Sequence, residues 1–391
     1  MNAMKEKLLQ GVDAVADEMF AVACDIFDHP EHGRTEVYAS DLLVRVLEEK
    51  GFTVERGLAD LPTSFRATWE RGTGGPSIGF LLEYDALKDM GHGCGHHLQG
   101  PNAIAAALAL RDAYPGDFKM VLYGTPDEEI AGGKIDMVNA GCFKDVDVMF
   151  ATHTASSTSV ACGNKALAPT WVDFHGTPAH ASGSPWKGRS AMDAMVLCFH
   201  ALEIMREHVK DGCRIHYTIK EGTGPSNIVH EKASVHITLR STDRLYLEGD
   251  MVPRMHDIVK GACLMTGTTA EITPRPVYWN YVTVNSLRNA VLDTAEEIGA
   301  PKVDRGPIFS GGSTDIGNVS WVVPTVNLYT YYSDHPAHTI PYMEEGKSEQ
   351  ARASLNWAAK TIGITALKVL NDPELLKTIR EEHKTAIYPN K

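Results

Sequence analysis

The sequence predicts an α/β protein in which a mostly parallel, helix-covered sheet is interrupted by a smaller inserted domain of the ferredoxin-like α+β type. Three observations lead to this prediction. Buried strands alternate with helices up to residue 166, a strand–helix–strand–strand–helix–strand series follows, and helices return from residue 278. A chain of 391 residues is also too long for one ordinary core. We therefore expect residues 1–166 and 278–391 to form one domain and residues 167–277 to form the other.

The first part of the chain begins with two predicted helices. Apolar residues recur at helical spacing over residues 4–28, and a second helix is expected from Glu36 to Glu49, before Gly51. Apolar and β-forming residues then predict five strands, which are FTVER, SFRATWE, SIGFLLEY, KMVLYGT and VDVMFATH. Two helices, PNAIAAALALRDAY and KIDMVNAG, separate the last three strands, and this alternation indicates a largely parallel sheet.

The character of the pattern changes at about Ala166, where alternating strands begin. The predicted elements of the inserted domain, in order, are ALAPTWVDFHG, SAMDAMVLCFHALEIMREHV, CRIHYTIKEG, ASVHITLRS, YLEGDMVPRMHDIVKGACLMTG and TAEITPRPVYW. A helix (VNSLRNAVLDTAEEIGA), a glycine-rich loop (SGGSTDIG) and a hydrophobic strand (VVPTVNLYTYY) come next. Helices from about Met343 onward are expected to complete the first domain.

Composition narrows the class of protein. The hydrophobic content of 43% and the charged content of 22% are typical of a soluble globular protein. The net charge of −13 argues against a nucleic-acid or anionic-membrane partner, because both require a basic surface. No apolar run has the length of a membrane span, and the N-terminus does not have the pattern of a signal peptide. Seven cysteines without disulfide-framework spacing favour a reducing compartment, and we expect a cytoplasmic protein.

The stretch EYDALKDMGHGCGHH, from Glu83 to His97, is unusually rich in potential metal ligands. It lies between a buried strand and the start of a helix, where open α/β sheets carry their chemistry. Thiolate and imidazole, here from Cys94 and His96, suit zinc and other borderline transition metals. A polar turn around a buried structural cysteine is the alternative. We favour a metal site because so many donors would otherwise crowd together without a counter-charge.

Polar side chains also follow the two later strands of this domain. Glu128 and Glu129 come just after one strand, and His153 ends the next. Taken alone, the two glutamates would be a solvated pair in the first turn of a helix, and His153 would be a hydrogen-bonded core residue. Because the ends of parallel strands meet at one edge of a sheet, we expect these residues to converge with Cys94 and His96.

These motifs resemble the M20 metallopeptidases and amidohydrolases. The strongest likeness is to the branch that contains auxin-conjugate hydrolases, aminoacylase-type enzymes and aminobenzoyl-glutamate hydrolase subunits, and it covers nearly the whole chain. Segments matching the family in the family's order are His29-Pro30-Glu31, the DAL that begins at Asp85, GHGCGHH, PDEE, His153, GTPAHA, NIV with a downstream arginine, and GGSTDIG. The chain departs from the branch at His97, where an aspartate commonly stands.

The resemblance implies a site for two divalent metal ions, zinc or manganese, with cobalt and nickel as alternatives. Cys94 would bridge the ions in place of the aspartate of the classical peptidases. The implied further ligands are His96, Glu129, His153 and a histidine near the C-terminus. The sequence offers His335 and His338 for that last position, and His338 fits the family pattern better.

The resemblance also implies roles around the metal ions. Glu128 would be the general base, and Asp85 would orient a ligand. His180 would reach into the site of the partner subunit and bind the oxyanion of the tetrahedral intermediate; a loop histidine at a turn is the alternative. The implied substrate-binding residues are Asn227, Arg240, Gly312 and, as a weaker candidate, Arg275. For Arg240 and Arg275 a solvated position on a strand is the alternative.

Together these matches imply a metal-dependent amidohydrolase that cleaves an N-acyl or N-aroyl amino acid, or a dipeptide-like substrate, each with a free carboxylate. They also imply a homodimer formed through the inserted domain, with a larger assembly left open. A deaminase or another C–N hydrolase on the same metal site is the alternative activity. A non-catalytic binding protein would have lost Glu128 or a ligand, and all of these residues are present.

Overall fold

The structure is a computed structural model that describes residues 1–309 and 312–387. It divides into two compact units. The larger unit comprises Met1–Gly163 with residues 281–309 and 314–387, and the smaller unit comprises Asn164–Asn280 with residues 312–313. The predicted limits of the inserted domain, 167–277, lie just inside these bounds.

The larger unit is built on an eight-stranded sheet within the described residues, in the order β1-β2-β4-β3-β5-β12-β6-β11. Strands β4, β3, β5 and β12 pair in parallel, which confirms the predicted mostly parallel sheet. Two short strands, β6 and β11, were not predicted. The strands are β1 (Thr53–Arg56), β2 (Phe65–Arg71), β3 (Ser77–Leu82), β4 (Phe118–Gly124), β5 (Val148–Ala155), β6 (Ser159–Gly163), β11 (Ile308–Phe309) and β12 (Thr325–Tyr331).

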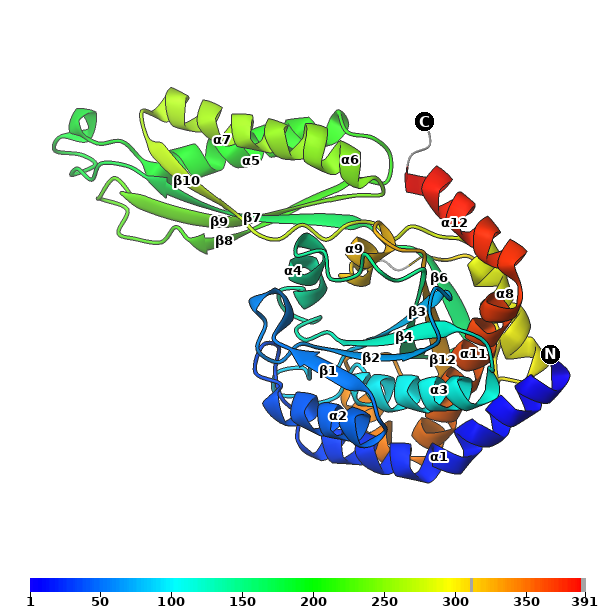
Figure 1. Cartoon of the computed structure of the whole chain (residues 1–391). Helices are drawn as coiled ribbons and strands as arrows, with labels where there is room; N and C mark the ends of the chain where they lie inside the picture. Colours follow the sequence, from blue (N-terminus) through cyan, green and yellow to red (C-terminus); the bar gives the residue numbers. More distant parts are fainter. Residues whose placement is uncertain (310–311, 388–391) are drawn as a thin grey trace. The chain divides into compact units, whose positions relative to one another are not determined.

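Helices cover both faces of this sheet, as Figure 1 shows. Helix α3 is alanine-rich and buried along nearly its whole length, because it packs against both α1 and α11 as well as the sheet. Helices α4 and α9 contribute to the core on the opposite face. The helices of this unit are α1 (Asn2–Asp28), α2 (Val37–Glu49), α3 (Gln99–Ala113), α4 (Gly133–Asn139), α8 (Asn285–Glu297), α9 (Ile316–Ser320), α10 (Ile340–Glu344), α11 (Glu349–Asn371) and α12 (Pro373–Ile387).

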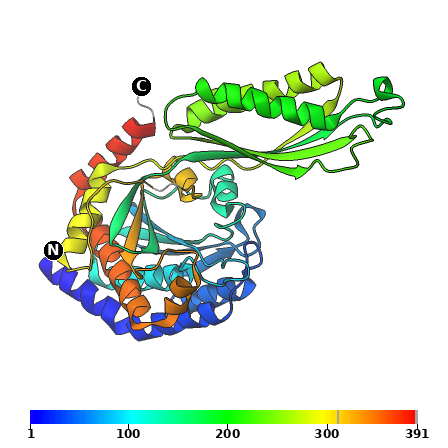
Figure 2. The same ribbon diagram turned by 180° about the vertical axis from the view of Figure 1, so that it is seen from behind.

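The smaller unit is an antiparallel four-stranded sheet in the order β10-β7-β9-β8, with α5 and α7 on one face (Figure 2). Residues along β9 alternate between buried and half-buried, as expected for a sheet with one face against helices. The elements confirm the predicted ferredoxin-like order. They are β7 (Ala166–His175), α5 (Ala191–Glu207), β8 (Arg214–Glu221), β9 (Lys232–Ser241), α6 (Arg244–Tyr246), α7 (Val252–Thr266) and β10 (Thr269–Pro274).

Two sequence-based expectations concern the chain as a whole. Among the helices of the described residues, none combines the length and apolar character needed to cross a membrane. All seven cysteines are free thiols. Cys198, Cys213 and Cys263 are buried in the core of the smaller unit, where they pack as small apolar residues.

Candidate metal centre

The candidate ligands gather at the carboxyl ends of the parallel strands of the larger unit. Glu83 and Asp85 follow the end of β3, Glu128 and Glu129 follow β4, and His153 lies near the end of β5. Because these three strands are parallel neighbours, their carboxyl ends share one edge of the sheet.

The turn that carries Cys94 and His96 is held tightly against β5. Gly95 has a positive φ of 78°, and a Cβ added there would overlap Oγ1 of Thr154, so the close approach requires glycine. Thr154 Oγ1 donates a hydrogen bond of 3.1 Å to the carbonyl of Cys94. The hydroxyl of Tyr342 in turn donates to Thr154 Oγ1 over 2.6 Å, so the turn has a fixed position on the sheet.

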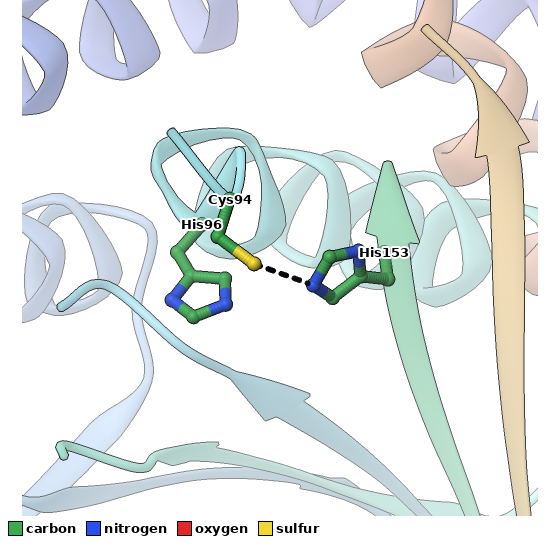
Figure 3. A group of neighbouring side chains, drawn as sticks. All are labelled: Cys94, His96 and His153. Carbon is green, nitrogen blue, oxygen red and sulfur yellow. Dashed lines mark hydrogen bonds between the residues drawn. The ribbon is translucent and has the colours of Figure 1, made fainter. Parts of the chain in front are cut away.

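The thiol of Cys94 lies between two imidazoles. Its Sγ is 3.4 Å from Nε2 of His153 and 3.3 Å from Nε2 of His338. Figure 3 shows the sulfur pointing towards the ring of His153. Sulfur and nitrogen ligands of one tetrahedral zinc ion lie about 3.6 Å apart, given bond lengths of about 2.3 and 2.0–2.1 Å. A sulfur near this distance from two separate imidazoles fits a ligand shared by two ions.

Asp85 fixes the orientation of His96. Its Oδ1 accepts from Nδ1 of His96 over 3.0 Å, so Nδ1 carries the proton and Nε2 presents a lone pair. Its Oδ2 accepts from the backbone amide of Glu129 over 3.0 Å. A carboxylate that orients a histidine in this way is a common partner of metal-binding imidazoles. These are the contacts that the predicted orienting role of Asp85 requires, and the role itself stays a prediction.

Among the described residues, Nε2 of His96 and Oε1 of Glu129 are buried and have no hydrogen-bond partner. They lie 4.0 Å apart, and Glu129 Oε1 is 3.6 Å from Nε2 of His338. Buried polar atoms normally have a hydrogen-bond partner. Atoms with free lone pairs that converge without such partners therefore indicate a site for cations. Donor atoms lie within 4.8 Å of one another in three groups: Cys94–His96–His153, Cys94–Glu129–His338 and His96–Glu128–Glu129. The residues present therefore fit metal ions.

The surroundings change the pKa values of the two glutamates in opposite directions. Burial raises the pKa of Glu128 well above its usual value, and the negative charges of Glu83 and Asp315 raise it further. Burial also acts to raise the pKa of Glu129, but the nearby imidazoles of His338 and His96 outweigh it and lower the pKa to about 2. Glu129 is thus suited to stay ionised as a ligand, whereas Glu128 is suited to accept and hold a proton.

The structure distinguishes the two C-terminal candidates. His338 lies in the cluster, in a left-handed backbone conformation with φ of 64°, and its amide donates to the carbonyl of Gly93 over 2.9 Å. Both histidines are exposed, but the side chain of His335 belongs to none of the donor groups found among the described residues.

The remaining candidates lie in the smaller unit, where the structure brings two pairs together. The segments that carry His180 and Asn227 lie side by side, because the amide of Ala181 donates a hydrogen bond of 2.8 Å to the carbonyl of Asn227. Nη1 of Arg240 donates to Oγ of Ser313 over 3.0 Å, next to Gly312. Arg275 is exposed and its guanidinium lies over the ring of Trp171, at 5.3 Å from the centroid. That contact favours the alternative interpretation of Arg275 as a solvated surface residue.

Sequence reasoning did not assign a role to three buried charged residues beside the centre: Glu83, Lys134 and Asp315. Each lies in a segment that the sequence analysis names. Lysine and aspartate are usually exposed, and no periodic apolar pattern around Lys134 or Asp315 predicts that these two side chains are buried. The short helix that carries Lys134, GKIDMVN, also carries Asp136, so its sequence offered no signal that the lysine is buried.

Metal binding by this cluster is expected to fall as the pH is lowered from neutral to pH 5, because its three imidazoles must be neutral to bind. The carboxylate of Glu129 raises the pKa of His338, and the charges of Cys94 and Asp85 outweigh burial and raise the pKa of His96, so protons compete with metal already near neutral pH. Equilibrium dialysis against a limiting concentration of zinc, followed by elemental analysis at each pH, measures the effect. Undiminished metal content at pH 5 would contradict a centre built on histidine ligands.

The chain is similar to enzymes that act on amino-acid derivatives. Xaa-Arg dipeptidase from Mus musculus is 33% identical over 402 residues, covering 98% of this chain and 93% of the relative. One of the subunits of p-aminobenzoyl-glutamate hydrolase from Escherichia coli (strain K12) is 29% identical, covering 93% and 91%. The fold matches the crystal structure of Bacillus subtilis YXEP, a dinuclear metal binding peptidase from the M20 family, with a TM-score of 0.70 at 18% identity, covering 92% and 99%.

Residues 79–354 match Peptidase family M20/M25/M40, and this range contains every predicted metal ligand. The match confirms the resemblance drawn from the motifs, and the donor groups at the sheet edge are the candidates for the metal site of such a family. The protein belongs to Peptidase family M20/M25/M40 and is a metal-dependent hydrolase of C–N bonds.

Proposed function

We propose that the protein hydrolyses the amide bond of an N-acyl amino acid, an N-aroyl amino acid or a dipeptide whose leaving amino acid bears a free carboxylate. The observation that carries this proposal is the convergence of Cys94, His96, Glu129, His153 and His338 beside the half-buried Glu128. The relatives support the substrate class, since their names specify a dipeptide ending in arginine and an aminobenzoyl-glutamate.

Two divalent ions bound by these residues would supply Lewis-acid activation of a water and of the substrate carbonyl. Glu128 takes a proton from the attacking water and delivers it to the leaving amine as the C–N bond breaks. The raised pKa of Glu128, which follows from its burial, favours retention of that proton between the two steps. Asp85 keeps His96 and the Glu129 backbone in place throughout. His180 is proposed to donate a hydrogen bond to the oxyanion.

Arg240 is the proposed partner of the substrate carboxylate. Its guanidinium is half-buried, and it has no carboxylate partner within 4.0 Å among the described residues. Burial lowers its pKa from the usual value, which reflects a cation that has lost water without gaining an anion. A planar guanidinium binds a carboxylate through two parallel hydrogen bonds, so an anionic substrate would replace the water that the Arg240 cation has lost.

A substrate panel combined with elemental analysis tests the proposal. Purified protein should carry zinc or manganese and release a free amino acid from at least one of three sets: N-acyl amino acids, N-(4-aminobenzoyl) amino acids and dipeptides. Methyl esters of the same compounds serve as matched controls, because they lack the carboxylate. Ammonia release with no amide cleavage would instead identify a deaminase.

Arg240→Met is expected to raise KM by about 10- to 100-fold with a smaller change in kcat, because it removes a charge-assisted hydrogen bond of about 1.5–3 kcal/mol. Arg275→Met is the matched control and should leave both constants near their wild-type values, since Arg275 lies exposed over Trp171. A larger effect of Arg275→Met would reverse the assignment.

We also propose that two copies associate through the β8 edge of the smaller unit. β8 is an edge strand of its sheet, and its Tyr217 stacks on Phe199 of α5 with ring centroids 4.2 Å apart. The same strand and helix expose large apolar residues: Ile219 is 54% exposed and Ile204 is 67% exposed. An unpaired strand edge beside an apolar helix face favours pairing across a two-fold axis.

If His180 serves the active site of the other copy, mixing two inactive variants, His180→Ala and Glu128→Gln, should restore part of the activity in hybrid dimers. One site of each hybrid then has an intact Glu128 together with an intact His180 of the other copy. Tagged subunits and native mass spectrometry establish that exchange has occurred. Complete exchange without recovery would place His180 in the site of its own subunit or outside catalysis.

A further inference from the structure

A buried ion cluster adjoins the metal centre. The side chain of Lys134, near the start of α4, is fully buried, and its Nζ lies 2.7 Å from Oε1 of Glu83 and 2.8 Å from Oδ1 of Asp315. The backbone amide of Lys134 also donates to Oδ2 of Asp315 over 3.0 Å. The cluster therefore joins three segments of the larger unit: the end of β3, the start of α4 and the residue before α9.

The charges of this cluster do not balance. Two carboxylates, each no more than 1% exposed, surround one ammonium group. Burying an ion without a partner is costly, so a purely structural cluster is expected to be neutral. A further positive charge beside Glu83 would balance the surplus negative charge of the cluster.

Glu83 is the member of the cluster that faces the metal centre. Its Oε2 lies 3.4 Å from Nε2 of His96, the buried nitrogen that has no hydrogen-bond partner among the described residues. Two ligand atoms bound at about 2.0–2.1 Å to one tetrahedral ion lie about 3.4 Å apart. Gln99 fixes the same carboxylate, because its Nε2 donates to Oε2 of Glu83 over 2.7 Å.

We propose that Glu83 is a further acidic residue of the metal centre, placed to share with His96 the ion that His96 binds, and that Lys134 is the positioning residue that holds the Glu83 carboxylate there. This inference rests on the metal centre of the proposed function and adds a residue to it. It also accounts for the surplus charge, since a divalent cation beside His96 would neutralise it.

Cobalt(II) binding tests the role of Glu83 without any substrate. The full-length protein is stripped with a chelator and titrated with Co²⁺, and the visible absorption bands report the ligands of the bound ion. Glu83→Gln should lower Co²⁺ affinity by about tenfold to hundredfold and shift the bands. Asp315→Asn is the matched control: it removes one carboxylate from the same cluster but none that faces His96, so affinity and bands should match the wild type.

The outcomes separate this inference from the proposed function. Wild-type affinity and bands in Glu83→Gln would overturn the inference alone, as would equal changes in Glu83→Gln and Asp315→Asn. Failure of the wild-type protein to bind Co²⁺ would overturn the proposed function as well. Should Glu83→Gln fail to fold, Glu83→Asp keeps the charge but retracts the carboxylate by one methylene, and it should still shift the bands.

A double-variant cycle tests the positioning role of Lys134. Lys134→Met should shift the Co²⁺ bands, and Lys134→Arg should restore them in part, because a cation again holds Glu83. In the Glu83→Gln background Lys134→Met should add no further shift. An equal shift in both backgrounds would show that Lys134 does not act through Glu83.

Discussion

Glu128→Gln is expected to keep the bound metal and the fold, and to lower kcat by about 10²–10⁴ with little change in KM. The amide has the shape of the carboxylate but cannot take the proton of the attacking water. Glu128 belongs to one of the three donor groups and lies outside both groups centred on Cys94, so its loss should not release the ions. Elemental analysis and steady-state kinetics of the same preparation measure both effects.

Glu129→Gln is the matched variant, since it makes the same chemical change one residue further on. Glu129 lies 3.6 Å from His338 and 4.0 Å from His96, and its low pKa reflects these imidazoles. Its variant should therefore lose metal as well as activity. Equal metal loss in both variants would show that the two glutamates do not divide the roles of base and ligand.

Much of the larger unit was predictable because its central strands are continuous apolar runs. SIGFLL is buried at all six positions, so its pattern matched a strand covered on both faces. Strand β6, with the sequence SVACG, and the two-residue β11 carry no such signal. Both strands form by pairing with segments far away in the sequence, so the residues of each strand do not by themselves predict it.

The same contrast applies to the site. Ligand-type residues at the ends of parallel strands predicted the convergence that the structure shows for Cys94, His96, Glu129 and His153. Their roles stay predictions. The choice of His338 over His335 rested on the family pattern. The position of His338 depends on its own left-handed backbone conformation and on its hydrogen bond to the carbonyl of Gly93, and neither can be read from the local sequence. Burial of Lys134 could not be predicted, since it depends on two carboxylates from distant segments.

Cys94→Ala is expected to lose at least one metal ion per subunit and nearly all turnover, because it removes the sulfur that lies within 3.4 Å of both His153 and His338. Cys94→Asp restores a bridging carboxylate and should retain some metal, with preference shifted towards harder ions. In the Co²⁺-loaded protein a thiolate ligand also gives a near-ultraviolet charge-transfer band, and this band should be absent from both variants.

Alkylation of the wild-type protein supplies an independent test of Cys94. Burial raises the pKa of its thiol, so the free thiol reacts slowly, and a small reagent with a long reaction time at alkaline pH is required. Bound metal should protect Cys94 completely, and a chelator should make it the cysteine whose labelling rises most. Cys142 is half-buried and lies outside the donor groups, so its labelling should not change, and the fully buried Cys198 should stay unlabelled. Equal labelling of Cys94 with and without chelator, together with an active Cys94→Ala variant, would remove Cys94 from the metal centre.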